Sequence, residues 1–168
     1  MPLRSLLAAR GEWRGSSRLY GPGPGKVEDS ASTLQVVPML RDTFVRLDYD
    51  WVLEGAPQQG SLLLGVDPAP RVISCHWIDT FHYGRSVMVL SGRTDADASD
   101  TGLGPASDPQ WGQEWGVEVR GSYPAPPGVD WGWRITITCD ADALQVAMFN
   151  IAPDGVEYPA VEAAYARA

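Results

Sequence analysis

One stretch of the sequence decides the fold: residues 44–54, which read FVRLDYDWVLE. Apolar or aromatic side chains occupy every second position, namely Val45, Leu47, Tyr49, Trp51 and Leu53. The charged residues fall on the other side, namely Arg46, Asp48, Asp50 and Glu54. Successive side chains of a β-strand point to opposite faces of its sheet. The stretch therefore predicts a strand with one face in the core and the other in water.

Similar alternation recurs along the chain, between turns rich in glycine and proline. The clearer segments are residues 59–66, 71–79, 114–123, 132–139, 143–151 and 158–167, and the weaker ones are 13–20 and 33–37. Residues 86–91 also predict a strand, which is apolar on both faces. Only the first residues have helical spacing, with Pro2 ahead of leucines at 3, 6 and 7. Two short turns, residues 140–142 and 153–155, predict hairpins.

Many short strands, each with one wet face and no helix to cover a sheet, favour a closed barrel or a sandwich. A closed barrel also leaves no exposed sheet edge. We therefore predict an all-β fold, a single antiparallel up-and-down barrel of about 8–10 strands, lipocalin-like, with a short N-terminal helix. The barrel is expected to span residues 1–168 as one domain, with a long acidic loop at residues 94–113.

Composition argues against several classes of partner. The 168 residues include 13 Lys and Arg against 21 Asp and Glu, a net charge of −8. Nucleic acids and anionic membranes are bound largely through Lys and Arg, so neither is expected as a partner. The apolar run Leu6-Leu7-Ala8-Ala9 is shorter than the core of a signal peptide, and we expect a cytoplasmic protein. Cys75 and Cys139 lie in strand-like segments and are expected to be buried thiols.

Two features resemble known barrel families. Gly11-Glu12-Trp13 resembles the Gly-x-Trp that opens the first strand of lipocalin-like barrels. In such barrels the tryptophan plugs the closed end and an arginine of the last strand stacks across it. The resemblance implies that Trp13 and Arg167 close this barrel, through a contact between a cation and an aromatic face.

A longer set of residues resembles the bacterial DUF1579 family over about residues 8–167. The matching stretches are Phe44–Tyr49, Gly60–Gly65, Trp77–Asp79, Gly121–Pro127 and Val161–Ala163. The resemblance implies the barrel fold and no assigned activity. Haem-binding barrels of the nitrobindin type share Gly-x-Trp but carry a glycine-rich segment after it, where this chain has Gly15-Ser16-Ser17-Arg18-Leu19. We expect no haem and no other cofactor.

The chain contains seven tryptophans, and this number suggests what the barrel interior is used for. Tryptophan is rarely fully buried and its N–H requires a partner, so a tryptophan-lined interior is typical of a pocket. The predicted ligand-binding residues are Tyr49, Trp51, Trp77, Tyr123, Trp133, Met148, Asn150 and Tyr165. They predict a site for a small apolar or aromatic molecule. In the alternative interpretation the same side chains fill the core.

Asp79 and His82 are the candidate catalytic pair. By alternation Asp79 shares the face of Trp77, where burial would raise the pKa of its carboxyl and suit it to proton transfer. Alternatively the strand ends at Ile78 and Asp79 begins a solvated turn. Along one strand His76 and His82 would lie ~20 Å apart, so we expect no metal site.

Three functions remain open from the sequence. The first is a non-catalytic barrel that binds an apolar or aromatic metabolite. The second is a cofactor-free isomerase, cyclase or lyase in which Asp79, with His82, moves protons. The third is a filled barrel that acts through its surface, for example as a homodimer.

Overall fold

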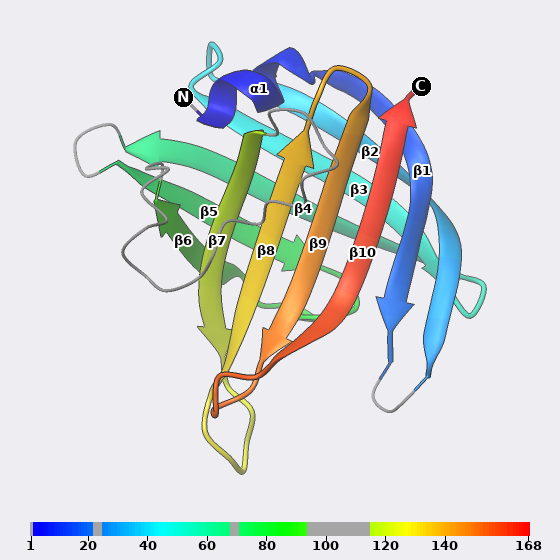
Figure 1. Ribbon diagram of the computed structural model, residues 1–168, viewed down its shortest axis with the longest axis vertical. Helices are drawn as coiled ribbons and strands as arrows, with labels where there is room; N and C mark the ends of the chain where they lie inside the picture. Colours follow the sequence, from blue (N-terminus) through cyan, green and yellow to red (C-terminus); the bar gives the residue numbers. More distant parts are fainter. Residues whose placement is uncertain (1, 22–24, 68–70, 94–114) are drawn as a thin grey trace.

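The computed structural model describes residues 2–21, 25–67, 71–93 and 115–168, and these form one closed β-barrel with a short helix across one end (Figure 1). The elements are α1 (Pro2–Ala8), β1 (Gly11–Tyr20), β2 (Val27–Met39), β3 (Phe44–Leu53), β4 (Ala56–Asp67), β5 (Val72–Asp79), β6 (Met88–Arg93), β7 (Trp115–Tyr123), β8 (Trp131–Cys139), β9 (Ala143–Ile151) and β10 (Glu157–Arg167). Each strand pairs antiparallel with the next, and β10 pairs with β1. The predicted up-and-down barrel with an N-terminal helix is confirmed.

Alternation of apolar and polar residues sets which face of each strand is buried. Along β5, burial alternates strictly from Ile73 to Asp79, so Cys75 and Trp77 point inward and His76 points into solvent. Asp79 is therefore the last inward residue of the strand, and the alternative in which it begins a solvated turn is wrong. The expected acidic loop at residues 94–113 lies outside the described residues.

The two predicted hairpins are present and are held by aspartate side chains. Asp140 accepts hydrogen bonds from the backbone N–H groups of residues 142 and 143 between β8 and β9. Asp154 accepts one from the N–H of Val156 between β9 and β10. Short polar side chains commonly stabilise turns in this way.

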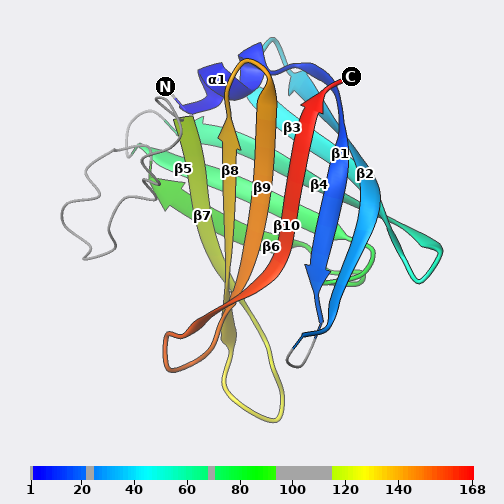
Figure 2. The same cartoon turned by 45° about the vertical axis from the view of Figure 1, so that its right-hand side comes forward.

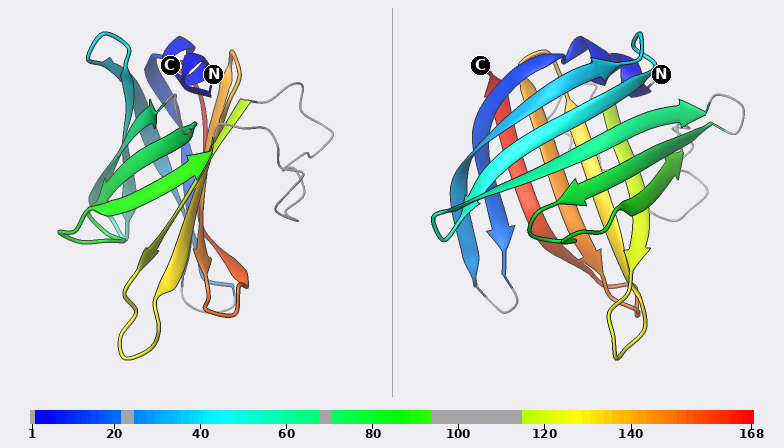
Figure 3. Two further views of the ribbon diagram at one scale, coloured as in Figure 1. Left: turned by 90° about the vertical axis from the view of Figure 1, so that its left-hand side faces the viewer. Right: turned by 180° about the vertical axis from the view of Figure 1, so that it is seen from behind.

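The barrel has two unlike ends. At the end drawn uppermost in Figure 1, α1 lies beside the start of β1 and the end of β10. The opposite end carries the β7–β8 and β9–β10 loops. Figures 2 and 3 show that β7–β10 cross over β3–β6, so the two halves of the wall face one another across the core. We call the α1 end the closed end and the opposite end the mouth.

Trp13 is the centre of the closed end. It is fully buried, and its Nε1 donates a hydrogen bond of 2.8 Å to the carbonyl of Ala9, which directly follows α1. The guanidinium carbon of Arg167 lies 4.7 Å from the Trp13 ring centroid. The Arg167 guanidinium also donates to the backbone carbonyls of Ala8, Arg10 and Ala141. Helix, first strand and last strand are thus fastened at one point.

Within the described part of the chain, no helix is long and apolar enough to cross a membrane.

Candidate functional site

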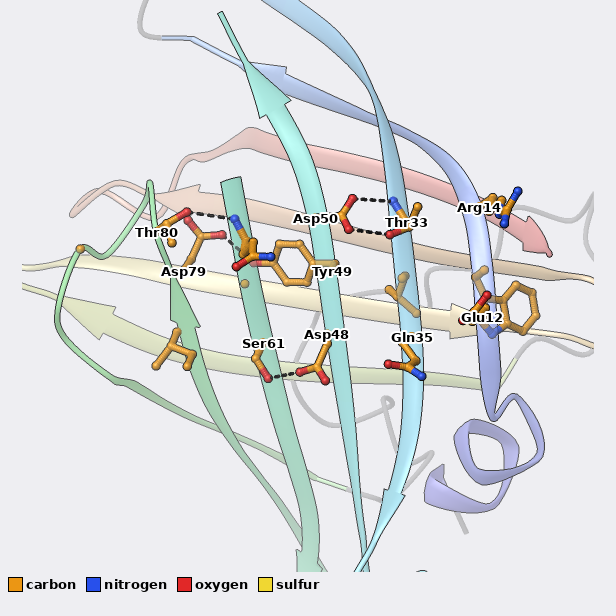
Figure 4. Close-up of a pocket in the computed structure, with 16 residues that line it drawn as sticks. Glu12, Arg14, Thr33, Gln35, Asp48, Tyr49, Asp50, Ser61, Asp79 and Thr80 are labelled. Carbon is orange, nitrogen blue, oxygen red and sulfur yellow. Dashed lines mark hydrogen bonds between the residues drawn. The ribbon is translucent and has the colours of Figure 1, made fainter. Parts of the chain in front are cut away.

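Three residues that lie side by side on neighbouring strands of the inner wall form the base of the site. Tyr49 on β3 pairs with Gly60 on β4, and Gly60 pairs with Asp79 on β5. A Cβ atom at Gly60 would lie 2.1 Å from the Tyr49 hydroxyl oxygen. Only glycine therefore lets the Tyr49 ring lie across β4 toward Asp79, as Figure 4 shows. The Tyr49 hydroxyl donates a hydrogen bond of 2.7 Å to Oδ2 of Asp79.

Asp79 is a buried carboxylate with a full set of donors, and its residue is only 4% exposed. Its Oδ1 accepts the backbone N–H groups of Phe81 at 2.7 Å and His82 at 2.8 Å. The same oxygen lies 3.1 Å from Nδ1 of His82. Trp77 extends the network, because its Nε1 donates to the Tyr49 hydroxyl at 2.8 Å.

Because of these donors, the pKa of Asp79 shifts in the direction opposite to the one expected from the sequence. Burial alone raises the pKa of its carboxyl, but hydrogen bonds and charge from His82, with the bond from Tyr49, outweigh burial and leave the pKa below its usual value. The expectation of a raised pKa is wrong because the turn after β5 supplies donors that strand alternation cannot reveal. Asp79 is thus held as an anion and is poorly suited to donating a proton.

Asp79 fixes the tautomer of His82. A carboxylate only accepts hydrogen bonds, so we assign the ring proton to Nδ1 of His82, which faces Asp79. In the neutral ring Nε2 then carries the lone pair. The arrangement leaves an oriented imidazole with its accepting nitrogen directed away from the carboxylate.

Aromatic side chains surround the His82 ring on several sides. Its centroid lies 5.9 Å from that of Trp51, 5.7 Å from that of Trp77 and 5.6 Å from that of Trp133. Trp77 and Trp133 stack on each other at 5.1 Å. Phe81, which is 45% exposed, packs edge-on against His82 at 4.9 Å.

Two nitrogen atoms of this cluster lack partners. Nε2 of His82 and Nε1 of Trp133 are buried and have no hydrogen-bond partner among the described residues. We call them the open nitrogens. Buried polar groups are hydrogen-bonded in the great majority of cases, and an unpaired one costs about 1–3 kcal/mol. Trp13 and Trp77, by contrast, both satisfy their indole N–H groups.

The barrel interior is largely filled. The cavity lined by Tyr49, Trp51, His82, Met148 and Tyr165, among others, has a volume of about 20 Å³. Such a volume holds roughly one water molecule. The expectation of an open aromatic interior is therefore corrected, because the large rings pack against one another and against His82.

The larger space lies at the mouth. A cleft of about 950 Å³ is bordered by the ends of β1, β3, β9 and the starts of β2, β8 and β10, together with Phe81 and His82. His82 borders both this cleft and the small interior cavity. The imidazole thus forms part of the partition between them.

The remaining predicted residues lie around this cluster. Tyr123 and Asn150 are half-buried near the mouth, where the tyrosine hydroxyl donates to the amide oxygen of Asn150. Met148 and Tyr165 are buried, and the Tyr165 hydroxyl contacts the Ser32 hydroxyl at 2.9 Å. Burial raises the pKa of Tyr165 to about 12, so its hydroxyl stays protonated. Trp13 and Arg167 lie at the closed end, away from the site.

A second hollow, of about 670 Å³, runs over the outer wall across β1–β5 (Figure 4). Four of its polar side chains bond to one another: Ser61 donates to Asp48, and Thr33 donates to Asp50. Tyr49 and Asp79 also border this hollow. Because the two carboxylates Asp48 and Asp50 are already paired, the outer hollow is a weaker candidate than the cluster at the mouth.

Sequence reasoning missed Phe81 and Gly60 and misjudged Asp79. An aspartate followed closely by a turn commonly accepts backbone N–H groups two and three residues later, and that signal was present. The contact with Tyr49 depends on strand register and had no local signal. His76 is exposed on the outer wall, and within the described ranges no cluster of His, Cys, Asp or Glu could hold a metal ion.

Comparisons with known proteins give a fold and a family. Rv2717c from M. tuberculosis has a solved structure that is similar over 99% of this chain and 97% of its own, with a TM-score of 0.67 and 15% identity. At that identity the likeness shows the fold alone. A second structure, of a "putative thioesterase II" from Thermobifida fusca YX, aligns over 97% of this chain and 82% of the other chain at 13% identity. Its TM-score is 0.22, so it carries no argument about this protein.

No curated protein matches the chain. A family model described as a protein of unknown function, DUF1579, matches residues 3–167, essentially the whole sequence. The chain therefore belongs to the DUF1579 family.

Proposed function

We propose that this protein binds a small planar molecule at the mouth of the barrel, with His82 as its principal polar contact. One observation carries the proposal: Nε2 of His82 is an open nitrogen on a ring that borders both the cleft and the interior cavity. Asp79 holds that ring in place from the other side. A ligand group that pairs with Nε2 would remove the penalty of leaving it unpaired.

The surroundings of His82 suit a flat ligand. Trp51, Trp77 and Trp133 present ring surfaces around the imidazole, and Phe81 packs edge-on against Trp51 and His82 and borders the cleft. Aromatic pairs contribute about 0.5–1.5 kcal/mol beyond the area they bury. Nε2 is buried, so a neighbouring side chain has to move aside for a ligand to reach it, and we assign this movement to the partly exposed Phe81 ring, which packs against His82 and borders the cleft. Phe81 lies in the connection between β5 and β6, where such movement disturbs no strand pairing.

A fluorescence titration tests the proposal. N-phenyl-1-naphthylamine, a neutral dye with a planar naphthalene ring, is expected to bind saturably with a dissociation constant in the micromolar range (10⁻⁶ M is about −8.2 kcal/mol). Val27 is 47% exposed and borders the cleft, so Val27→Trp fills part of it and should weaken binding at least tenfold. Gln35 borders the outer hollow, and Gln35→Trp should leave binding unchanged.

The two variants separate the two hollows. Loss of binding in Gln35→Trp, with Val27→Trp unaffected, would place the ligand on the outer wall. Absence of saturable binding to the unmodified protein would overturn the proposal. Native mass spectrometry of the protein from its own host would in addition give the mass of any retained natural ligand.

A second candidate function, proton transfer, is favoured by the contact between Asp79 and His82. The carboxylate orients the imidazole and would stabilise the imidazolium formed when Nε2 takes a proton. In this scheme His82 is the base and Asp79 is a positioning residue. Deuterium exchange at the carbon next to the carbonyl of 2-tetralone, followed by NMR, should be catalysed by the protein and lost in His82→Gln. Equal exchange in both proteins would exclude this activity.

A further inference from the structure

The charge inside the barrel restricts the ligand. Asp79 is the one buried charged side chain among the described residues, and it is an acid. The other buried polar side chains in this part of the protein are Ser17 and Ser32. Beside a neutral His82, a carboxylate ligand would therefore enter a low-dielectric interior with no buried Lys or Arg among the described residues to pair with, and burying an unpaired charge is strongly unfavourable.

The charged residues at the mouth also disfavour an anionic ligand. Its cleft is lined by Glu28 and Glu54 and, on the basic side, by Lys26 among the residues described. Glu28 accepts a hydrogen bond from the backbone N–H of Glu54, so its carboxylate is fixed at the rim. The whole chain carries a net charge of −8. Both the approach and the interior thus disfavour an anion.

The open nitrogens have opposite hydrogen-bonding roles. In the neutral imidazole Nε2 of His82 accepts, because Nδ1 carries the ring proton toward Asp79. Nε1 of Trp133 only donates. The two rings lie 5.6 Å apart between centroids. A hydroxyl group donates through its hydrogen and accepts through its oxygen, so it matches both roles at once.

We infer that the ligand is an uncharged planar ring system with a hydroxyl group of the phenol type, which donates to Nε2 of His82 and accepts from Nε1 of Trp133. The inference deepens the proposed function and rests on it. It also implies discrimination against carboxylates of the same shape. The water-sized cavity that is bordered by His82, Tyr49 and Trp51 gives the hydroxyl a place beside the imidazole.

Three naphthalenes that differ in one group test the inference by isothermal titration calorimetry at pH 7. They are 2-naphthol, 2-methoxynaphthalene and 2-naphthoate. We expect 2-naphthol to bind at least tenfold more tightly than either analogue. The ether cannot donate to Nε2, and the naphthoate brings a negative charge beside Asp79.

Two histidine variants provide the matched comparison. His82→Phe keeps an aromatic ring in the cluster but removes Nε2, so the preference for naphthol over the ether should fall to about twofold or less. His76→Phe makes the same change on the exposed outer face of β5 and should retain the full preference. Circular dichroism establishes that each variant is folded before it is titrated.

The outcomes separate the inference from the proposed function. If the three naphthalenes bind equally well, or naphthoate binds best, the hydroxyl inference is overturned while binding at the mouth stands. If His82→Phe keeps the preference for naphthol, the hydroxyl is recognised elsewhere and the inference is again overturned. If none of the three binds, both the inference and the proposed function are overturned.

Discussion

The two ends of this barrel are both built around tryptophan, yet they differ in how completely their polar groups are paired. At the closed end the indole N–H of Trp13 bonds to Ala9, and Arg167 covers the ring while donating to three carbonyls. At the mouth, Trp77 is bonded through Tyr49 to Asp79, but Trp133 and His82 each hold an open nitrogen. The polar groups at the closed end are thus paired within the protein, whereas those at the mouth have hydrogen-bonding capacity left for a ligand.

This difference in hydrogen-bond pairing indicates which end of the barrel contributes mainly to stability and which to binding. A satisfied polar network in a low-dielectric site rigidifies the structure, and an unsatisfied one costs free energy until a partner arrives. Sites of binding commonly tolerate such a cost because the rest of the molecule over-determines the fold. Substitutions at the closed end should therefore reduce stability, and those at the open nitrogens should mainly alter binding.

The largest effect is expected from Trp13→Ala. Removing a fully buried indole that joins α1, β1 and Arg167 should lower the free energy of unfolding by about 3–5 kcal/mol. Urea denaturation followed by circular dichroism measures it. Trp131→Ala, at a half-buried position beside the mouth, is the control and should lose about 1 kcal/mol or less. Similar losses in both variants would show that the two ends do not differ in this way.

An intermediate effect is expected from Asp79→Asn, which keeps the shape of the side chain and removes its charge. The variant should lose about 1–3 kcal/mol at pH 7, because the carboxylate accepts four donors. The pKa of Asp79 is lowered in the folded state, so its contribution is fully present above the unfolded pKa of about 3.9. The contribution is then lost as the pH falls through the lower, folded pKa.

The difference in stability between the unmodified protein and Asp79→Asn should accordingly shrink below about pH 4. Urea denaturation at pH 7, 5 and 3 measures this difference. Asp42→Asn, on the exposed turn between β2 and β3, serves as the control and should show no such trend. A gap that widens toward pH 3 would contradict the assignment of Asp79 as a carboxylate held by donors.

The smallest effect comes from a matched pair, Trp13→Phe and Trp133→Phe. Both variants lose an indole N–H at a buried position and nearly the same volume. Trp13→Phe also breaks a hydrogen bond to Ala9, whereas Trp133→Phe removes one of the open nitrogens. Thermal denaturation should show Trp13→Phe to be less stable by about 1 kcal/mol. If Trp133→Phe is the less stable variant, the indole N–H of Trp133 has a partner within the protein itself.

The sequence by itself determined the barrel and the residues that face its core. Alternation in segments such as residues 44–54 and 71–79 fixes which side chains point inward, because successive residues of a strand face opposite sides. It also placed Asp79 and His82 close together, since they are three residues apart at the end of a strand. Those inferences depend only on local geometry.

The tertiary structure decided how the inward residues meet. Tyr49 reaches Asp79 only because β3, β4 and β5 align in one register with Gly60 between them. The side-chain hydrogen bond and charge of His82, with the backbone N–H of His82 and the Tyr49 hydroxyl that this register brings in, lower the pKa of Asp79, although burial alone would raise it. Whether aromatic rings leave a cavity or fill it likewise depends on packing across the barrel, which alternation along a single strand does not specify.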